Sequence, residues 1–241
     1  MFALIERLFP SAPTQASALV GAAGLAIAMG GCGGPKAPPS ASWMPDSSGW
    51  VFREAEASDS PRWVLYERDA LVADVKEFRI VGVLDAEPAV AMEALRYRLL
   101  AEEYVPDMLQ RRILTNTESE VEVYGLVELP FPMRDREATE RMEFTHDPTT
   151  GVFRVDATLI DPGTEPPPGV VRAPVIQNSW TLAPTGTGSS VFTVDTVHDM
   201  GGTMLNVAIY GAICDGLVDD LFIINDLALS MAGDNTERGH L

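Results

Sequence analysis

Hydrophobic and polar positions alternate most regularly in residues 120–128. Every second residue from Val121 to Val127 is valine or glycine, whereas glutamates occupy three of the positions beside and between them. Side chains change face at each step along an extended strand, so this period of two separates an apolar face from a charged one. The segment is therefore predicted to be a strand with one dry face.

Two pairs of similar segments are separated by turn-forming residues and predict two hairpins. The first pair, residues 140–146 and 152–159, flanks Asp147-Pro-Thr-Thr-Gly151, and the second runs through residues 170–182 and 191–198. Asp, Pro and Gly favour tight turns because of their backbone preferences. The inward face of the first hairpin is predicted to carry six apolar residues: Met142, Phe144, Phe153, Val155, Ala157 and Leu159.

The chain before these hairpins predicts strands followed by a helix. Runs rich in β-branched and aromatic residues, at 50–54, 63–67 and 75–84, predict a three-stranded meander. Pro88 then begins a pattern with the three- and four-residue recurrence of an amphipathic helix. That pattern extends through Met108, with Pro106 as an interruption.

The last apolar segment ends near Met231 and has the spacing of a long helix with a wide apolar face. Asp220 falls between Ile209 and Ile213 on that face, where a bare carboxylate is costly. Three explanations stay open. The carboxylate pairs with an arginine of a cavity, it binds a polar group of a ligand, or the helix is rotated or kinked near Gly216.

The order of the elements is three strands, a helix, about six strands and a closing helix, which predicts a segregated α+β domain. A curved antiparallel sheet must cover the very apolar last helix. Such a sheet encloses either a filled core or a cavity, and the hydrophobic pattern does not choose between them.

Composition and charge narrow the possible partners. The 241 residues include 17 Lys and Arg against 35 Asp and Glu, a formal net charge of −18, and 46% are hydrophobic. This composition supports one sizeable core. Binding to nucleic acid needs a basic face, so nucleic acid is excluded as a partner.

The first 31 residues are predicted to be a secretory signal. No charged residue occurs between Arg7 and Lys36, and the small apolar run Ala16–Met29 is too short to span a bilayer. The Gly-Gly-Cys sequence that follows resembles the lipobox of bacterial lipoproteins. By that resemblance Cys32 is the acylated first residue of the mature chain.

The predicted domains follow from this leader. Residues 1–31 are the signal peptide, 32–48 a Pro- and Ser-rich tether, 49–232 the folded domain and 233–241 a disordered tail. The protein is then expected to be a membrane-anchored lipoprotein that faces the periplasm or the cell exterior. The second cysteine, Cys214, is expected to be a buried free thiol.

Motifs that would indicate an enzyme are absent from the sequence. There is no Gly-x-Ser-x-Gly, no phosphate-binding glycine loop, no Cys-x-x-Cys and no His-Glu-x-x-His. His146 and His198 are expected to be solvated histidines at the ends of strands. The sequence therefore predicts no catalytic residue, no metal site and no cofactor.

Four segments in order resemble START domains, the steroidogenic-acute-regulatory-related lipid-transfer family, in particular those of the phosphatidylcholine transfer protein type. They cover residues 49 to about 230. The segments are Gly49-Trp50-Val through Trp63-Val-Leu-Tyr-Glu-Arg68, Pro130-Phe-Pro-Met-Arg-Asp-Arg-Glu137, Pro168-Gly-Val-Val-Arg172 with Trp180-x-Leu-x-Pro184, and Asp199-Met-Gly-Gly202.

The resemblance implies a helix-grip fold, in which a curved antiparallel sheet wraps around a long C-terminal helix. It also implies a hydrophobic tunnel that holds one lipid, with no cofactor and no covalent chemistry. The residues expected to line this tunnel are Val123, Val127, Met142, Phe144, Phe153, Val155, Trp180, Leu205, Ile209, Ile213 and Asp220.

One departure from the family bears on the ligand. Members that bind a polar-headed ligand carry an arginine six residues beyond the motif arginine, which is Arg136 here. Met142 occupies that position, and Arg141 beside it is predicted to face outward. A neutral ligand such as a sterol, a hopanoid-like molecule or a fatty molecule is therefore favoured.

Two alternatives to lipid binding or transfer stay open. Related helix-grip proteins include cyclases and aromatases, which need polar groups in the tunnel, so an Arg or Tyr partner for Asp220 would favour an enzyme. A lipoprotein that binds a protein partner, and no ligand, would instead have bulky side chains filling the concave face of the sheet.

Overall fold

The computed structural model describes residues 49–58, 61–101, 108–129, 133–186 and 188–238. The predicted signal, Cys32 and the tether therefore lie outside the described residues. Within them, ten strands form one sheet. The strands are β1 (Val51–Ala55), β2 (Trp63–Asp69), β3 (Lys76–Leu84), β4 (Met108–Asn116), β5 (Glu120–Val127), β6 (Arg136–Asp147), β7 (Val152–Leu159), β8 (Val171–Arg172), β9 (Val175–Pro184) and β10 (Ser190–Asp199).

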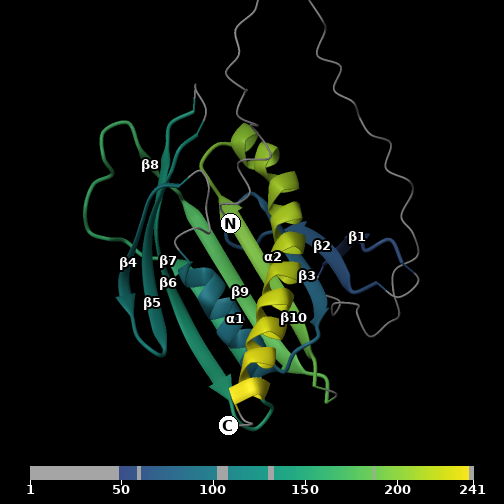
Figure 1. The fold of residues 1–241 in the computed structure, drawn as a ribbon. Helices are drawn as coiled ribbons and strands as arrows, with labels where there is room; N and C mark the ends of the chain where they lie inside the picture. Colours follow the sequence, from purple (N-terminus) through teal and green to yellow (C-terminus); the bar gives the residue numbers. More distant parts are fainter. Residues whose placement is uncertain (1–48, 59–60, 102–107, 130–132, 187, 239–241) are drawn as a thin grey trace, which may run out of the picture.

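The sheet is antiparallel and strongly curved, and two helices occupy its hollow side (Figure 1). The strand order is β1-β2-β3-β10-β9-β7-β6-β5-β4, and the short strand β8 pairs in parallel with β6. Helix α1 (Pro88–Leu100) follows the first three strands, and helix α2 (Thr203–Arg238) closes the chain. This architecture confirms the predicted α+β helix-grip fold.

Helix α2 lies along β3 and β10, and α1 lies beside α2 against β7 and β9 (Figure 1). The close approach of α2 to the sheet depends on Gly82 in β3. A Cβ atom at this position would lie 2.3 Å from Leu221 Cδ1, which no side-chain carbon tolerates. The missing side chain therefore lets Leu221 reach the sheet.

The first helix ends earlier than its sequence pattern predicts. Helix α1 stops at Leu100, and Met108 belongs to strand β4 and not to the helix. Arg111 of β4 donates to the carbonyl oxygens of Leu99, Leu100 and Ala101. These bonds satisfy carbonyl groups that have no partner inside the helix.

The sequence analysis missed β4 because its alternation is interrupted. The pairing of β4 with β5 shifts register between Met108 and Gln110 and again between Ile113 and Thr115. Each irregularity adds a residue and moves the following side chains to the other face. A period of two therefore does not persist long enough to be recognised.

Helix α2 is longer than expected and continues to Arg238, so residues 233–238, which the sequence assigns to a tail, are helical. Within the described residues, neither helix is long and apolar enough to cross a membrane. Cys214 of α2 is a buried free thiol, as predicted, and burial raises its pKa to about 12.

Candidate functional site

The register of the strands identifies the surface that faces the helices. Residues paired across an antiparallel ladder point to the same side of the sheet. Gly82 of β3 faces Leu221 of α2, so its side of β3 is the side toward the helices. The residues paired with this side of β3 across the ladders face the helices as well. One such row links β3 to β5 and consists of Phe78, Thr196, Asn178, Ala157, Met142 and Val121. We call this side of the sheet the concave face.

All seven strand residues that the sequence assigns to a tunnel lie on the concave face: Val123, Val127, Met142, Phe144, Phe153, Val155 and Trp180. Phe144 and Phe153 are partly buried against the core, and the other five are buried. Ile209 and Ile213 of α2 are buried in the same core, whereas the side chain of Leu205 lies outside the described residues. That these residues line a ligand tunnel stays a prediction.

Large and small side chains both lie on the concave face. The half beneath α2 carries large residues such as Phe78 and Phe192. The paired positions of β5, β6 and β7 instead include Gly125, Ala138 and Ala157. These positions put a patch of small side chains on the concave face.

Glu140 is a charged residue among these small ones. It pairs with Val123 and Leu159 across the ladders, so it points to the concave face, and only 7% of its surface is exposed. Burial raises the pKa of its carboxyl group to about 7, and the positive charge of Arg111 acts in the opposite direction. The predicted alternation of Met142 and Phe144 already implies an inward Glu140, but the sequence analysis did not single it out.

A second polar group on the concave face consists of His198, Asn178 and Thr196, all of them buried. The Asn178 side-chain oxygen accepts from Thr196 Oγ1 and lies 3.0 Å from His198 Nε2, which must therefore carry the proton. The prediction that His198 is solvated is wrong, because the ring lies on the concave face and only 4% of the residue is exposed. Burial lowers the pKa of His198 to about 3, so the ring is neutral.

Glu140 and His198 lie at the same level of the sheet. Glu140 pairs with Leu159, and His198 pairs with Ile176. Leu159 and Ile176 are the next positions on their strands after the pair Thr158 and Gln177, so they are adjacent as well. Three strand spacings, about 14 Å, therefore separate Glu140 from His198 along the concave face.

Arg136 ties the sheet to the turn before α2. Its guanidinium donates to the carbonyl oxygens of Met200 and Gly201, with Nη2 at 3.1 Å from the latter. Asp199 accepts at 2.8 Å from both the Gly201 amide and the Asn206 side chain. The family-like segments around Arg136 and Asp199 therefore meet in space and position the first turn of α2.

Two other residues of those segments meet on the opposite face. Arg172 Nη2 lies 2.8 Å from Glu137 Oε1, and the Tyr124 hydroxyl donates to Glu137 Oε2 at 3.3 Å. Their side chains alternate with Arg136 and so point away from the concave face. This cluster joins β8 to the sheet and contributes nothing to the helix-facing space.

Met142 and Arg141 are oriented as the sequence predicts. Met142 is buried on the concave face, and Arg141 points outward to Glu122, with Nη2 2.7 Å from Oε1. At the position where polar-headed ligands would need an arginine, the side chain is therefore an uncharged thioether.

The structure accounts for Asp220 through a helix-to-helix contact. Arg98 Nη2 of α1 lies 3.2 Å from Asp220 Oδ1, and both side chains are partly buried. The carboxylate thus pairs with an arginine, as the first explanation proposes, but this arginine belongs to the neighbouring helix. The pair lies between α1 and α2, and it is not in contact with Glu140 or His198.

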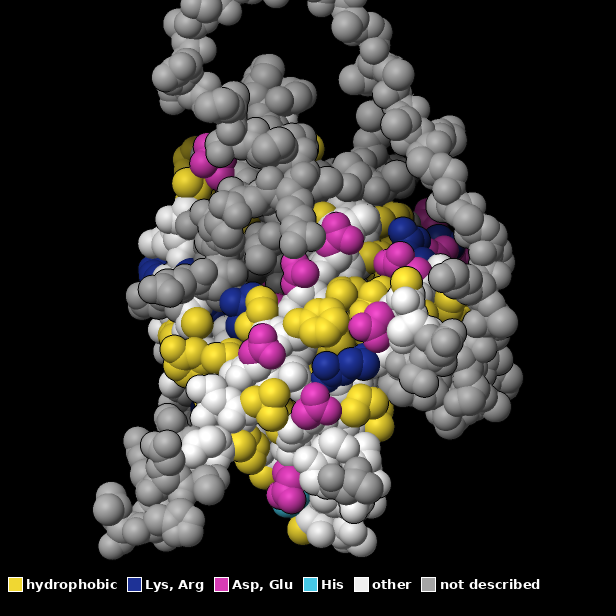
Figure 2. Space-filling model, turned by 45° about the vertical axis from the view of Figure 1, so that its right-hand side comes forward, with side chains coloured by type: hydrophobic (Ala, Val, Ile, Leu, Met, Phe, Trp, Pro, Cys, Tyr) yellow, Lys and Arg dark blue, Asp and Glu magenta, His cyan; other side chains and the backbone are white. Residues whose placement is uncertain are grey.

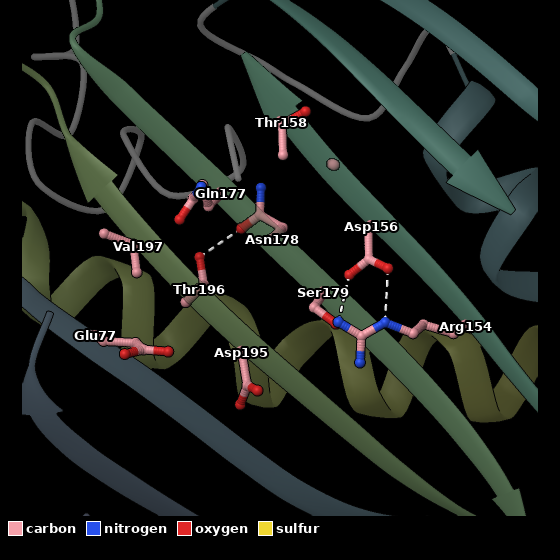
Figure 3. A pocket seen from close by; sticks show the side chains of 11 residues that line it. Glu77, Arg154, Asp156, Thr158, Gln177, Asn178, Ser179, Asp195, Thr196 and Val197 are labelled. Carbon is pink, nitrogen blue, oxygen red and sulfur yellow. Dashed lines mark hydrogen bonds and ion pairs between the residues drawn. The ribbon is translucent and has the colours of Figure 1, made fainter. Parts of the chain in front are cut away.

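The opposite face of the sheet has a hollow of about 260 Å³, with α2 lying behind the sheet in this view (Figure 3). Its lining is polar, and its charged groups pair with neighbours: Arg154 with Asp156, Asp195 with Arg79, and Glu77 with Arg68. No group of His, Cys, Asp and Glu in the described part of the chain could hold a metal ion. We therefore do not assign the site to this hollow.

The exposed side of α2 combines acidic and apolar side chains. Figure 2 shows acidic groups spread among hydrophobic ones on this face of the molecule. Phe222 and Leu229 are exposed large hydrophobic residues of the helix. Two exposed acidic residues lie near them in the sequence, Asp226 between the two and Asp215 before them. The surface nearest to the helix-facing space is therefore neither uniformly charged nor uniformly apolar.

Comparison of the sequence with family models and with curated proteins finds no match. Solved structures do match. A fragment of the STAR-related lipid transfer protein from Xanthomonas axonopodis is 20% identical, with a TM-score of 0.59 over 75% of this chain and 98% of that one. Human STARD10 is 14% identical, with a TM-score of 0.60 over 80% of this chain and 78% of that one.

A third match is the lipid transfer and protein localization domain of human StarD13. It is 19% identical, with a TM-score of 0.56 over 74% of this chain and 88% of that domain. At these identities the similarity establishes the fold. The chain has a START-like helix-grip fold.

Proposed function

We propose that this protein binds one hydrophobic small molecule, a lipid or a sterol-like compound, between the concave face and the two helices. The observation that carries the proposal is the set of small side chains at Gly125, Ala138 and Ala157, opposite a half-sheet whose larger residues are packed under α2. The START-like fold supports the same location.

Binding of this kind is driven by partition from water. Each square ångström of apolar surface that the ligand buries contributes about 25 cal/mol, so a ligand that buries about 300 Å² gains roughly 7 kcal/mol before the costs of association. No covalent step is needed. Movement of the helices or the neighbouring loops then limits exchange of the ligand.

A neutral ligand fits the side chains better than an anionic one. Met142 supplies no positive charge where the family places an arginine, and the guanidinium groups of Arg136 and Arg111 bond to backbone carbonyl groups. An anionic head would therefore have no free cation on this part of the concave face within the described residues.

The membrane attachment is a further part of the proposal. An acyl chain on Cys32 and a tether over residues 32–48 would hold the domain at a bilayer that faces the periplasm or the cell exterior. The lipobox-like Gly-Gly-Cys and the uncharged run before it support this. Mass measurement of the membrane-extracted protein checks it, because acylation at Cys32 adds the mass of the lipid and removes residues 1–31.

An enzyme of the cyclase type is the second candidate. Asp220 does have the arginine partner that would favour it, but Arg98 belongs to α1, and the pair joins the two helices. A lipoprotein that binds only a protein partner is the third. The small residues at Gly125, Ala138 and Ala157 argue against it, because a collapsed face would carry bulky groups at those positions as well.

A size substitution on the concave face tests ligand binding. Ala157→Phe places a ring into the proposed space and should reduce uptake of hexadecan-1-ol, followed by native mass spectrometry, by at least about tenfold. Thr158→Phe is the matched control, because the next residue points to the opposite, exposed face. It should load like the unchanged protein.

Thermal unfolding shows whether each variant is folded. If Ala157→Phe does not fold, Ala138→Leu makes a smaller change on the same face. A folded variant of either kind that takes up the alcohol as well as the control would contradict the proposal.

A further inference from the structure

The carboxyl group of Glu140 is buried without a partner. Within the described residues no hydrogen bond or ion pair reaches it; burial raises its pKa, and the positive charge of Arg111 acts in the opposite direction from a distance. Arg111 is committed elsewhere, because its guanidinium bonds to the last carbonyl groups of α1. Burying a carboxyl group without a hydrogen-bond partner destabilises the folded protein, so the presence of Glu140 at this position needs an explanation.

The surroundings of Glu140 on the concave face are apolar. Its partners across the two ladders are Val123 and Leu159, and Met142 is the next inward residue on its own strand. Only 7% of the residue is exposed. None of these three neighbours has a side chain that could donate a hydrogen bond to the carboxyl group.

We propose that Glu140 binds the hydroxyl group of a neutral apolar alcohol, as the acceptor that fixes the polar end of the ligand in the helix-facing space. This inference rests on the proposed function and specifies its ligand class. A hydroxyl group donates to a carboxylate and accepts from a carboxylic acid, so it satisfies Glu140 in either protonation state.

The same geometry selects against an anionic head. A carboxylate ligand would place a second negative charge beside Glu140 in a dry environment, where like charges repel strongly. The polar residues at the same level, His198 and Asn178, bring no compensating cation, because the imidazole is neutral and its Nε2 proton is used within the group. Fatty acids are therefore excluded more strongly than alcohols of the same length.

A pair of probes with identical chains isolates the head group. Full-length protein is incubated at pH 8 with equal amounts of hexadecan-1-ol and hexadecanoate, and native mass spectrometry measures the bound ratio. The unchanged protein should favour the alcohol by about tenfold or more, since a charge-assisted hydrogen bond replaces a repulsion. Glu140→Gln keeps the shape and removes the charge, so it should bring the ratio to within about threefold.

Glu143→Gln is the control. Glu143 is on the same strand, is exposed and occupies an odd position that points away from the concave face, so this variant should keep the preference of the unchanged protein. Folding of Glu140→Gln is not in question, because the change removes a buried charge.

The outcomes separate the inference from the proposed function. Equal binding of both probes by the unchanged protein, or a preference that survives in Glu140→Gln, overturns the assignment of Glu140 while ligand binding stands. Binding of neither probe overturns both. If hexadecylamine displaces the alcohol from the unchanged protein but not from Glu140→Gln, the preferred head group is an ammonium and the hydroxyl assignment is wrong.

Discussion

Glu140 and His198 are buried titratable residues whose pKa values are shifted in opposite directions. Burial raises the pKa of Glu140 to about 7 and lowers that of His198 to about 3. In both, burial favours the neutral form of the residue in the folded protein. The unfolded chain ionises Glu140 as the pH rises and His198 as the pH falls, so each residue favours unfolding at one end of the range.

Glu140→Gln should stabilise the protein above pH 7. The unfolded glutamate loses its proton near pH 4.5 and the folded one near 7, so stability falls as the pH rises through that interval and stays low above it. Removing the carboxyl group should therefore raise the free energy of unfolding by roughly 3 kcal/mol at pH 8 and change it little at pH 4.5. Urea titrations at the two pH values measure this, and an equal effect at both would contradict it.

His198→Asn should remove the acid sensitivity. An unfolded histidine gains a proton below pH 6.5, whereas the buried ring resists protonation down to about 3, so stability is complete above 6.5 and is lost as the pH falls. At pH 5 this loss is about 2 kcal/mol in the unchanged protein. The variant has a lower stability at neutral pH because hydrogen bonds to Asn178 are altered, but its urea midpoint should decline less between pH 7 and pH 5.

Gly82 is the residue that determines how closely α2 approaches the sheet. Gly82→Val should destabilise the protein by about 1 to 3 kcal/mol, because the new side chain overlaps Leu221. The cost should shrink in a Leu221→Ala background, where room has been made, and a double-mutant cycle measures this coupling. Val83→Ile, at the next position and on the other face, is the control. Additive effects of Gly82→Val and Leu221→Ala would show that the contact does not limit the packing.

The contact between Arg98 and Asp220 should affect stability and leave loading unchanged. Coupling between these partly buried groups is expected to be about 0.5 to 1 kcal/mol in a double-mutant cycle with Arg98→Met and Asp220→Leu. Uptake of hexadecan-1-ol by Asp220→Leu should equal that of the unchanged protein. A loss of uptake without a loss of stability would return Asp220 to the ligand site.

The elements that the sequence predicted well are those with an uninterrupted period. Strand β5 and the hairpin of β6 and β7 follow from alternation, and the inward set led by Met142 and Phe144 was correct. Strand β4 was missed because two register shifts erase its alternation, and α1 was extended too far because residues beyond Leu100 still offered apolar positions. Burial of His198 was not predictable, since the position of a residue near the end of a strand does not show what packs over it.

Acidity is a property of the whole molecule and governs its approach to a bilayer. With a net charge of −18, the domain should be repelled by anionic lipids, and salt should weaken that repulsion because the Debye length falls to about 10 Å at 0.1 M. Exchange of hexadecan-1-ol with vesicles that contain phosphatidylglycerol should therefore accelerate between 10 mM and 300 mM salt. Exchange with purely phosphatidylcholine vesicles is the reference. A rate that is independent of salt in both would contradict this prediction.

The position of β10 between β3 and β9 also determines the order in which the chain can fold. Strand β3 ends at Leu84, and its neighbour on the side away from β2 begins only at Ser190, so that edge of β3 has no partner until more than a hundred further residues have been synthesised. Pairing over such sequence separation is slow, and an open strand edge invites association with other chains. We therefore expect nascent or truncated chains that lack residues 190–199 to aggregate through β3, and a chaperone to be needed until β10 emerges.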